Sequence, residues 1–158
     1  MGCENKGTRI RRVVSRFEEV VCESIELCDL YGSQVRMASA VASLLRPHLE
    51  HETQERFVAL LLNCKHRVMG FAEVSRGTLT ASLVHPREVF APALREHAAA
   101  IIVAHNHPSG DPEPSHEDIE VTRRLHEAGK LLGVPLLDHI IVGEGGSFTS
   151  LRERVGLM

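Results

Sequence analysis

The amino-acid sequence predicts an α/β fold in which helices flank a mixed β-sheet. Short apolar runs of strand length alternate along the chain with segments whose apolar residues recur at helical spacing. Two predicted strands follow one another directly early in the chain, and two more segments do so near its end. Interleaved helices and strands with such adjacent pairs favour a mixed sheet over an all-parallel one.

The first two predicted elements are helices. Apolar residues recur at helical spacing over 13–30, until Tyr-Gly-Ser breaks the pattern. A second helix over 34–45 is expected to stop before Pro47, because the residue before a proline disfavours helical geometry. We therefore divide the chain into an N-terminal helical appendage, residues 1–50, and a main domain, residues 51–158.

The main domain is expected to open with strands. The continuous apolar run FVALLL is typical of a central strand that is buried on both faces. After the turn NCKHR the chain returns as a partner strand, and a third short strand follows SRG. These predicted strands are 57–62, 68–74 and 79–84.

Helices and strands alternate in the second half of the chain. Pro86 suits the first position of a helix, and Gly129 is expected to end the next helix. Two further apolar runs surround that helix, and GEGG turns into a last short strand. The predicted helices are 85–98 and 115–128, and the predicted strands are 98–105, 133–143 and 147–151.

The composition limits the possible functions. The chain has 158 residues, 43% of them hydrophobic, which suits a single globular domain with its own core. The net charge of −3 supplies no overall positive field for nucleic acid, so DNA binding through the basic residues 6–16 is expected to be weak. The four cysteines have no CxxC spacing, and the sequence shows neither a signal-peptide core nor an apolar run of membrane-spanning length. We therefore expect reduced thiols, a cytoplasmic location and no membrane partner.

The stretch AHNHPSGDPEPSHED, residues 104–118, carries the candidate functional side chains. His105 and His107 are two residues apart, so in an extended segment both point to one side while Asn106 points away. Two neutral imidazoles can occupy two corners of a tetrahedral zinc site. Asp118 is the best candidate for a third ligand, because the proline-rich loop can fold the start of the next helix back toward the strand end.

Each part of this pattern also has a purely structural interpretation. An HxH pair occurs by chance on many surfaces, and SHED is a capping box with Ser115 at the N-cap and Asp118 three residues later. Asp111, in SGDP, suits a turn. The complete spacing is far more restrictive than its parts, because Ser115 and Asp118 must follow HxHP at fixed distances.

The segment HNHPSGDPEPSHED resembles the JAMM signature of JAB/MPN+ metallohydrolases. Residues 52–152 resemble the RadC family more closely, through VHPREVF, AAAIIVAHNHPSGDPEPS and AGKLLGVPLLDHIIVG. The resemblance implies a JAB/MPN-like, cytidine-deaminase-like fold with one Zn²⁺ held by His105, His107 and Asp118. It also implies that Ser115 helps to stabilise an oxyanion, and that a glutamate near the first strand acts at the site.

Glu55 is the preferred glutamate, because it opens ERFVALLL directly ahead of the apolar strand. Glu52 is the second candidate and Glu73, on the partner strand, is the third; each also suits a solvated acid. Zinc lowers the pKa of a bound water toward about 7. Glu55 would accept the proton of that water as general base, and Zn²⁺ with Ser115 would hold the developing oxyanion.

Two further polar residues, Asp138 and His139, lie on the predicted strand PLLDHIIV. Neighbours on a strand face opposite sides, so only one of the two can face the site. That residue either supports the metal ligands through hydrogen bonds or is a core residue whose polar atoms are hydrogen-bonded elsewhere.

Two departures from these families bear on the substrate. Residues 1–50 are too short for the helix-hairpin-helix module of longer RadC proteins and lack its glycine-bearing hairpin, so a DNA-repair role would rest on analogy. Eukaryotic relatives grip ubiquitin through insertions for which this chain has no obvious room between Leu79 and His105. A ubiquitin substrate is therefore not implied.

The leading hypothesis is a zinc-dependent hydrolase that cleaves a peptide or isopeptide bond in an unknown protein or peptide. The first alternative is a RadC-type accessory protein of DNA repair or a metal-dependent nuclease. The second is a metal-bound scaffold that has lost activity. The sequence sets no oligomeric state.

Overall fold

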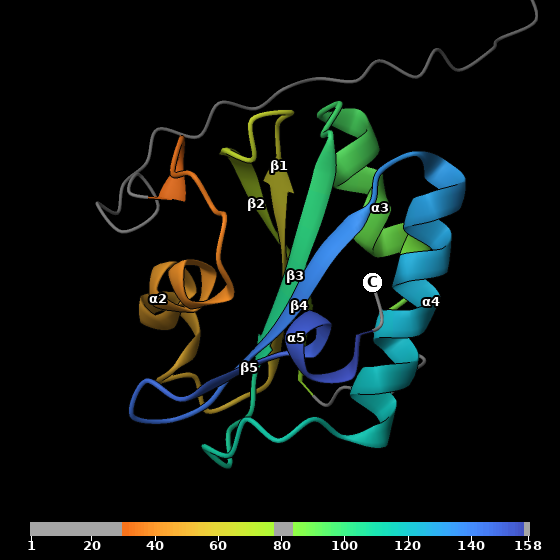
Figure 1. Cartoon of the computed structure of the whole chain (residues 1–158). Coiled ribbons are helices and arrows are strands. Elements are labelled where there is room, and N and C mark those ends of the chain that lie inside the picture. Colours follow the sequence, from red (N-terminus) through yellow and green to blue (C-terminus); the bar gives the residue numbers. More distant parts are fainter. Residues whose placement is uncertain (1–29, 78–83, 157–158) are drawn as a thin grey trace, which may run out of the picture.

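A computed structural model describes residues 30–77 and 84–156, and there it contains a five-stranded sheet with helices on both sides (Figure 1). The predicted α/β class with a mixed sheet is confirmed. The elements are, in chain order, α2 (Ala38–Leu49), β1 (Arg56–Leu62), β2 (Val68–Arg76), α3 (Pro86–Arg95), β3 (Ala100–Asn106), α4 (His116–Leu132), β4 (Leu136–Val142), β5 (Phe148–Ser150) and α5 (Leu151–Val155).

The strands are ordered β2-β1-β3-β4-β5 in the sheet. Strand β1 runs antiparallel to both β2 and β3, β3 runs parallel to β4, and β4 runs antiparallel to β5. A parallel pair needs a crossover, and α4 provides it between β3 and β4. Figure 1 shows that the chain leaves β3 and enters α4 at one end of the sheet, and the segment 104–118 spans this connection.

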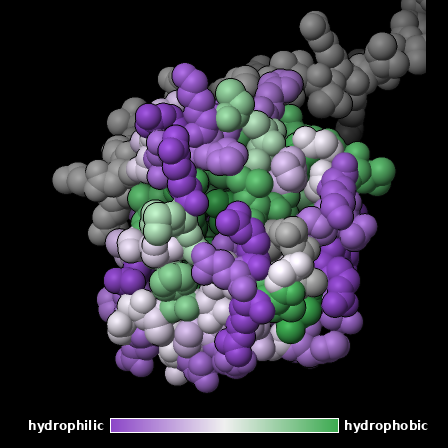
Figure 2. Space-filling model, in the orientation of Figure 1, coloured by the Kyte–Doolittle hydropathy of each residue, from purple (hydrophilic) through white to green (hydrophobic). Residues whose placement is uncertain are grey.

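Two apolar cores lie on opposite faces of the sheet. On one face, Leu45 and Leu49 of α2 pack against Leu60 of β1. On the other face, helices α3 and α4 cover Phe57 and Val103. Strand β1 is thus buried on both faces, as its continuous apolar run predicted. Figure 2 shows that α4 presents a mainly hydrophilic surface on its outer side.

Helix α2 differs from the prediction, because it continues through Pro47 to Leu49. The proline ring removes the N–H that would bond to the carbonyl of Ser43. Ser43 is exposed, so water can satisfy that carbonyl. The fully buried Leu45 and Leu49 anchor both sides of the proline to the core. Tertiary packing therefore overrides the local stop signal.

Helix α4 also runs further than predicted, to Leu132 rather than to the residue before Gly129. Gly133 is the left-handed C-cap, with φ of 71°. Gly129 has a different role: a Cβ there would lie 2.7 Å from the carbonyl oxygen of Val134. Gly129 lets the chain that follows the helix pass close to its backbone. In the sequence, a glycine required for such close packing looks the same as a glycine that caps a helix.

Except for their last residues, the predicted helix 13–30 and the predicted strand 79–84 lie outside the described residues. The division at residue 50 stays a prediction, although α2 shares its core with the sheet. Within the part of the chain that the structure describes, no helix is both long enough and apolar enough to cross a bilayer.

Candidate metal centre

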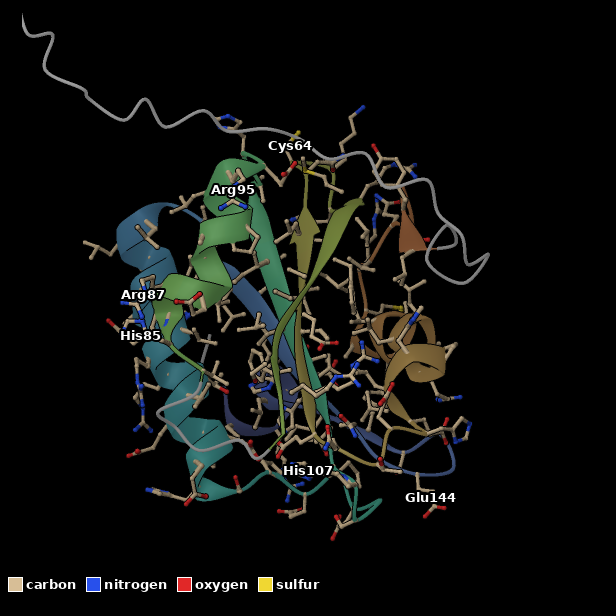
Figure 3. All side chains as sticks on the ribbon, turned by 180° about the vertical axis from the view of Figure 1, so that it is seen from behind. Cys64, His85, Arg87, Arg95, His107 and Glu144 are labelled. Atoms are coloured by element: carbon tan, nitrogen blue, oxygen red, sulfur yellow. The ribbon has the colours of Figure 1, made fainter. Side chains whose placement is uncertain are left out.

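The two histidines of the motif lie where the chain leaves β3. His105 is in the strand and fully buried. His107 is partly exposed just beyond the strand (Figure 3). The backbone N–H of His107 donates to the carbonyl of Val142 at 3.1 Å and so extends the pairing with β4 beyond the strand. The Nε2 atoms of His105 and His107 lie 3.0 Å apart. The predicted convergence of the two imidazoles is therefore present.

The start of α4 brings Asp118 to the same place. The Ser115 hydroxyl accepts the N–H of Asp118, and the Asp118 carboxylate accepts the N–H of Ser115, which is the predicted capping box. The carboxylate remains within reach of both imidazoles. Its Oδ1 lies 3.2 Å from Nε2 of His105, and its Oδ2 lies 3.4 Å from Nε2 of His107.

Sheet register brings Glu55 to this end of the molecule. Phe57 of β1 pairs with His105 of β3 in an antiparallel arrangement, so the residue two before Phe57 lies near His107. Oε1 of Glu55 is 3.6 Å from Nε2 of His105. One potential ligand atom from each of Glu55, His105, His107 and Asp118 falls within a 4.8 Å limit of every other.

Asn106 fastens the segment that carries Glu55. Its Oδ1 accepts the backbone N–H of Arg56 at 2.8 Å, and its Nδ2 donates to the carbonyls of Glu52 and Gln54 at 3.3 and 3.1 Å. Three hydrogen bonds thus join the end of β3 to the chain on both sides of Glu55. The sequence placed Asn106 on the opposite side from the histidines but gave it no role.

The other two candidate glutamates lie in a different cluster. Glu52 accepts a hydrogen bond from Nη1 of Arg56 at 2.7 Å, and Glu73 is bound by both Arg56 and Arg76. Hydrogen bonds, the first from Arg76, outweigh burial and lower the pKa of Glu73. Of the three glutamates, only Glu55 is in the cluster with the histidines.

Hydrogen-bond geometry leaves Nε2 of His107 as an acceptor when this imidazole is neutral. Nδ1 of His107 lies 2.8 Å from the carbonyl oxygen of Asp111, which can only accept, so the hydrogen is on Nδ1. Nδ1 of His105 lies 2.8 Å from Nε2 of His139, a contact in which either ring can donate. An acceptor nitrogen of His107 and the carboxylate of Asp118 repel one another when they meet directly, whereas both can bind a divalent cation. The donor set therefore fits a metal ion.

Electrostatics in the metal-free cluster lead to the same conclusion. A hydrogen bond to Asp118 raises the pKa of His107 against the opposing effect of burial. Burial acts to raise the pKa of Asp118, but contacts with His105 and His107 outweigh it and hold that pKa far below its usual range. Positive charge is therefore favoured between these side chains, and a cation would replace a proton there.

The loop between His107 and α4 is fixed by turn chemistry and by close packing. Asp111 accepts the N–H of Glu113 on its own side chain, in keeping with a turn role, and it lies outside the cluster. Gly110 accepts the N–H of Glu144. A Cβ on Gly143 would lie 2.5 Å from the carbonyl oxygen of Gly110, so the β4–β5 turn supports the loop only because residue 143 has no side chain.

Of the two polar residues on β4, His139 faces the cluster and Asp138 does not. Asp138 accepts hydrogen bonds from Ser150 and from the backbone of Arg152, and burial raises its pKa. His139 is fully buried behind His105, and desolvation lowers its pKa. Its other ring nitrogen contacts Thr122 of α4, a residue that the sequence did not single out because its partner lies 17 residues away on another element.

Comparisons with known proteins agree with this geometry. The family profile of the RadC-like JAB domain matches residues 35–157. A UPF0758 protein of Symbiobacterium thermophilum is 57% identical over 73% of this chain and 49% of its own length. A UPF0758 protein of Geobacter sulfurreducens is 61% identical over 92% of this chain and 62% of its own length.

The chain spans about half the length of the curated relatives it matches. The family match, in contrast, covers most of the chain and contains all four residues of the cluster. The chain therefore belongs to the RadC-like JAB domain family.

Proposed function

We propose that this chain is a zinc-dependent hydrolase that cleaves an amide bond, either a peptide or an isopeptide bond. The observation that carries the proposal is the convergence of Glu55, His105, His107 and Asp118 at one end of the sheet. The family membership supports it, as does the resemblance of the motif to the JAMM signature.

The proposed ligands of Zn²⁺ are His105, His107 and Asp118. Two imidazole nitrogens and one carboxylate oxygen are a common ligand set of catalytic zinc, which keeps a further position for water. When bound, Zn²⁺ would lower the pKa of water and polarise a carbonyl group. Asp118 and His105 are almost completely buried, which keeps the ligands in place, while His107 is on the accessible side.

Glu55 is proposed to move the proton. Its carboxylate is on the partly exposed side of the cluster, 3.6 Å from His105. It would take a proton from the attacking water and deliver it to the nitrogen of the leaving amine. The water oxygen bonds to the carbonyl carbon as the C–N bond breaks, so the products are a carboxylic acid and an amine.

Ser115 is proposed to assist at the carbonyl oxygen. In the structure its hydroxyl donates to Oδ2 of Asp118 at 2.8 Å. Rotation of the hydroxyl would redirect that hydrogen toward a developing oxyanion, while the oxygen remains the helix cap.

The substrate is proposed to approach from beside Glu55. A cleft lined by Thr53, Gln54, Glu55, Gly77 and Pro108 opens there. None of these five described residues carries a basic side chain, which favours a neutral peptide over a nucleic acid, and the net charge of −3 acts in the same direction. We further propose a cytoplasmic location, on the basis of the cysteine usage.

The test is a substrate panel with the zinc-loaded full chain. Peptide, isopeptide-linked and nucleic-acid libraries are incubated with wild type and with the His105→Ala/His107→Ala variant. New amine ends with wild type alone support the proposal. Cleaved phosphodiester bonds would favour the nuclease alternative, and no cleavage by a fully zinc-loaded chain would favour the inactive scaffold.

A further inference from the structure

We propose that Thr122 and His139 are positioning residues that hold His105 in the tautomer with hydrogen on Nδ1, leaving its Nε2 lone pair available to a metal ion. The inference rests on the proposed function, because it assigns His105 to the metal. The hydrogen-bond chain itself is observable without metal, so the two ideas can fail separately.

The chain begins at Thr122. Its hydroxyl oxygen lies 2.6 Å from the carbonyl oxygen of Asp118 and 2.6 Å from Nδ1 of His139. Two oxygens at that distance need a hydrogen between them, and a carbonyl has none to give. The hydroxyl hydrogen is therefore directed to Asp118. The contact with His139 then needs a hydrogen from the imidazole, which places it on Nδ1.

The tautomer of His139 in turn determines the tautomer of His105. His139 is fully buried against Phe57, so it is neutral and has one ring hydrogen, which leaves Nε2 as an acceptor. That Nε2 lies 2.8 Å from Nδ1 of His105. The hydrogen in this contact must come from His105, whose own Nε2 is then bare and directed at Asp118 and His107.

The reverse order of donors fails. If His139 donated from Nε2, its Nδ1 would have to accept from the Thr122 hydroxyl. The contact between Thr122 and the carbonyl of Asp118 would then have no hydrogen. In a neutral chain, only one arrangement satisfies all three contacts.

Packing fixes the rings as well as their hydrogens. Phe57 stacks on His105 at 5.9 Å and 14°, and it meets His139 edge-on at 5.3 Å. The chain starts at the backbone of one proposed ligand, Asp118, and ends at another, His105. Metal-binding histidines usually donate their second N–H to a carboxylate, a carbonyl or water. Here the acceptor is a second imidazole whose orientation α4 sets through Thr122.

The test uses the full chain with three variants. Thr122→Val keeps the side-chain volume but removes the hydroxyl, and Thr122→Ser keeps the hydroxyl. Ser150→Ala is the matched control, because it removes a buried hydroxyl that bonds to Asp138, outside the cluster. Long-range ¹⁵N–¹H spectra of the metal-free protein report the tautomers, and competition with a chromogenic chelator reports Zn²⁺ affinity.

We expect hydrogen on Nδ1 of both His139 and His105 in wild type and in Thr122→Ser. Thr122→Val should lose this single tautomer and bind Zn²⁺ roughly 10- to 100-fold more weakly. Ser150→Ala should lower thermal stability and leave both readouts unchanged. Hydrogen on Nε2 of His139 in wild type, or unchanged Zn²⁺ affinity in a folded Thr122→Val protein, would overturn the inference. A wild type that binds no Zn²⁺ contradicts the proposed function, while its spectrum still decides the tautomer.

Discussion

Asn106 accepts the backbone N–H of Arg56 through its side-chain oxygen, and this contact joins β3, the strand that contains His105, to the residue that follows Glu55. The side chain of Asn106 points away from the cluster, yet it sets where the proposed general base begins its strand. Replacing it should therefore affect proton transfer more than metal binding.

The first prediction follows from this contact. Asn106→Ala removes three hydrogen bonds and leaves the partly buried N–H of Arg56 without its acceptor. Stability should fall by about 1–3 kcal/mol, and activity should fall while zinc content is retained. Asn63→Ala is the matched control, because Asn63 accepts two backbone N–H groups at the other end of β1. Equal loss of activity in both variants would contradict a local role for Asn106.

Glu55→Gln should separate proton transfer from metal binding. Glutamine keeps the size of the side chain but not its basicity, so turnover should drop by roughly 10²–10⁴-fold. Zinc should remain bound, as elemental analysis can show. Glu52→Gln serves as the control, because Glu52 contacts Arg56 instead of the histidines. If Glu52→Gln abolished activity and Glu55→Gln did not, the wrong carboxylate has been assigned.

One equivalent of zinc per chain is expected after purification without chelator. The variant His105→Ala/His107→Ala should contain almost none, because the remaining carboxylates of Asp118 and Glu55 form a weak zinc site without the imidazoles. His116→Ala is the control, since this exposed histidine pairs with Glu120 on the outside of α4. Full zinc occupancy in the double variant would disprove the ligand assignment. Inductively coupled plasma mass spectrometry is the measurement.

The difference in melting temperature between zinc-loaded and chelated protein should grow as the pH rises from about 6 to about 8. The pKa of His107 is raised in the folded, metal-free chain by its contact with Asp118. Its stabilising contribution is therefore complete below the ordinary histidine pKa of about 6.5 and is lost as the pH rises through the raised value. Zinc needs the deprotonated ring, so its affinity rises over the same window.

The groups that face His107 are Asp118, Glu55 and His105, and contacts with the two histidines hold the pKa of Asp118 far below this range. His107→Ala should remove the loss of stability that the chelated protein shows as the pH rises through the raised pKa of His107. A difference in melting temperature that stays constant from about pH 6 to pH 8 would contradict the assignment of His107.

Gly143→Ala tests how the β4–β5 turn supports the loop between His107 and α4. The new Cβ would lie 2.4 Å from the Ser147 hydroxyl and 2.5 Å from the carbonyl oxygen of Gly110, so the loop after His107 must move. Zinc affinity should fall by roughly tenfold or more, as when other supporting contacts of a metal site are lost. Gly70→Ala should have little effect, because its Cβ would meet only Leu61 at 3.5 Å. Chelator competition measures both.

The sequence predicted most of what depends on local pattern. Strand β1 and the proline that opens α3 appear where periodicity and turn chemistry placed them. The capping box of α4 is also present, with Ser115 and Asp118 in their expected positions. These features need only residues that are near one another in the chain.

What escaped prediction depends on contacts between distant segments. Pro47 stays inside α2 because Leu45 and Leu49 are anchored in the core, and Gly129 is inside α4 because the chain crosses there. Thr122 and Asn106 escaped for the same reason. The pairing of β1 with β3 brings Asn106 to its partners, and the packing of α4 against β4 brings Thr122 to His139; no short motif encodes either contact.

The three proposed ligands all lie within residues 105–118, whereas Glu55 joins them only through the pairing of β1 with β3. Closing so short a loop around an ion costs little conformational entropy. The unfolded chain should therefore retain part of the affinity for zinc. Binding to the unfolded state reduces the stabilisation that a ligand confers, so zinc should raise the melting temperature less than its affinity for the folded protein implies. During folding, zinc should therefore bind to residues 105–118 before the pairing of β1 with β3 brings Glu55 to the site.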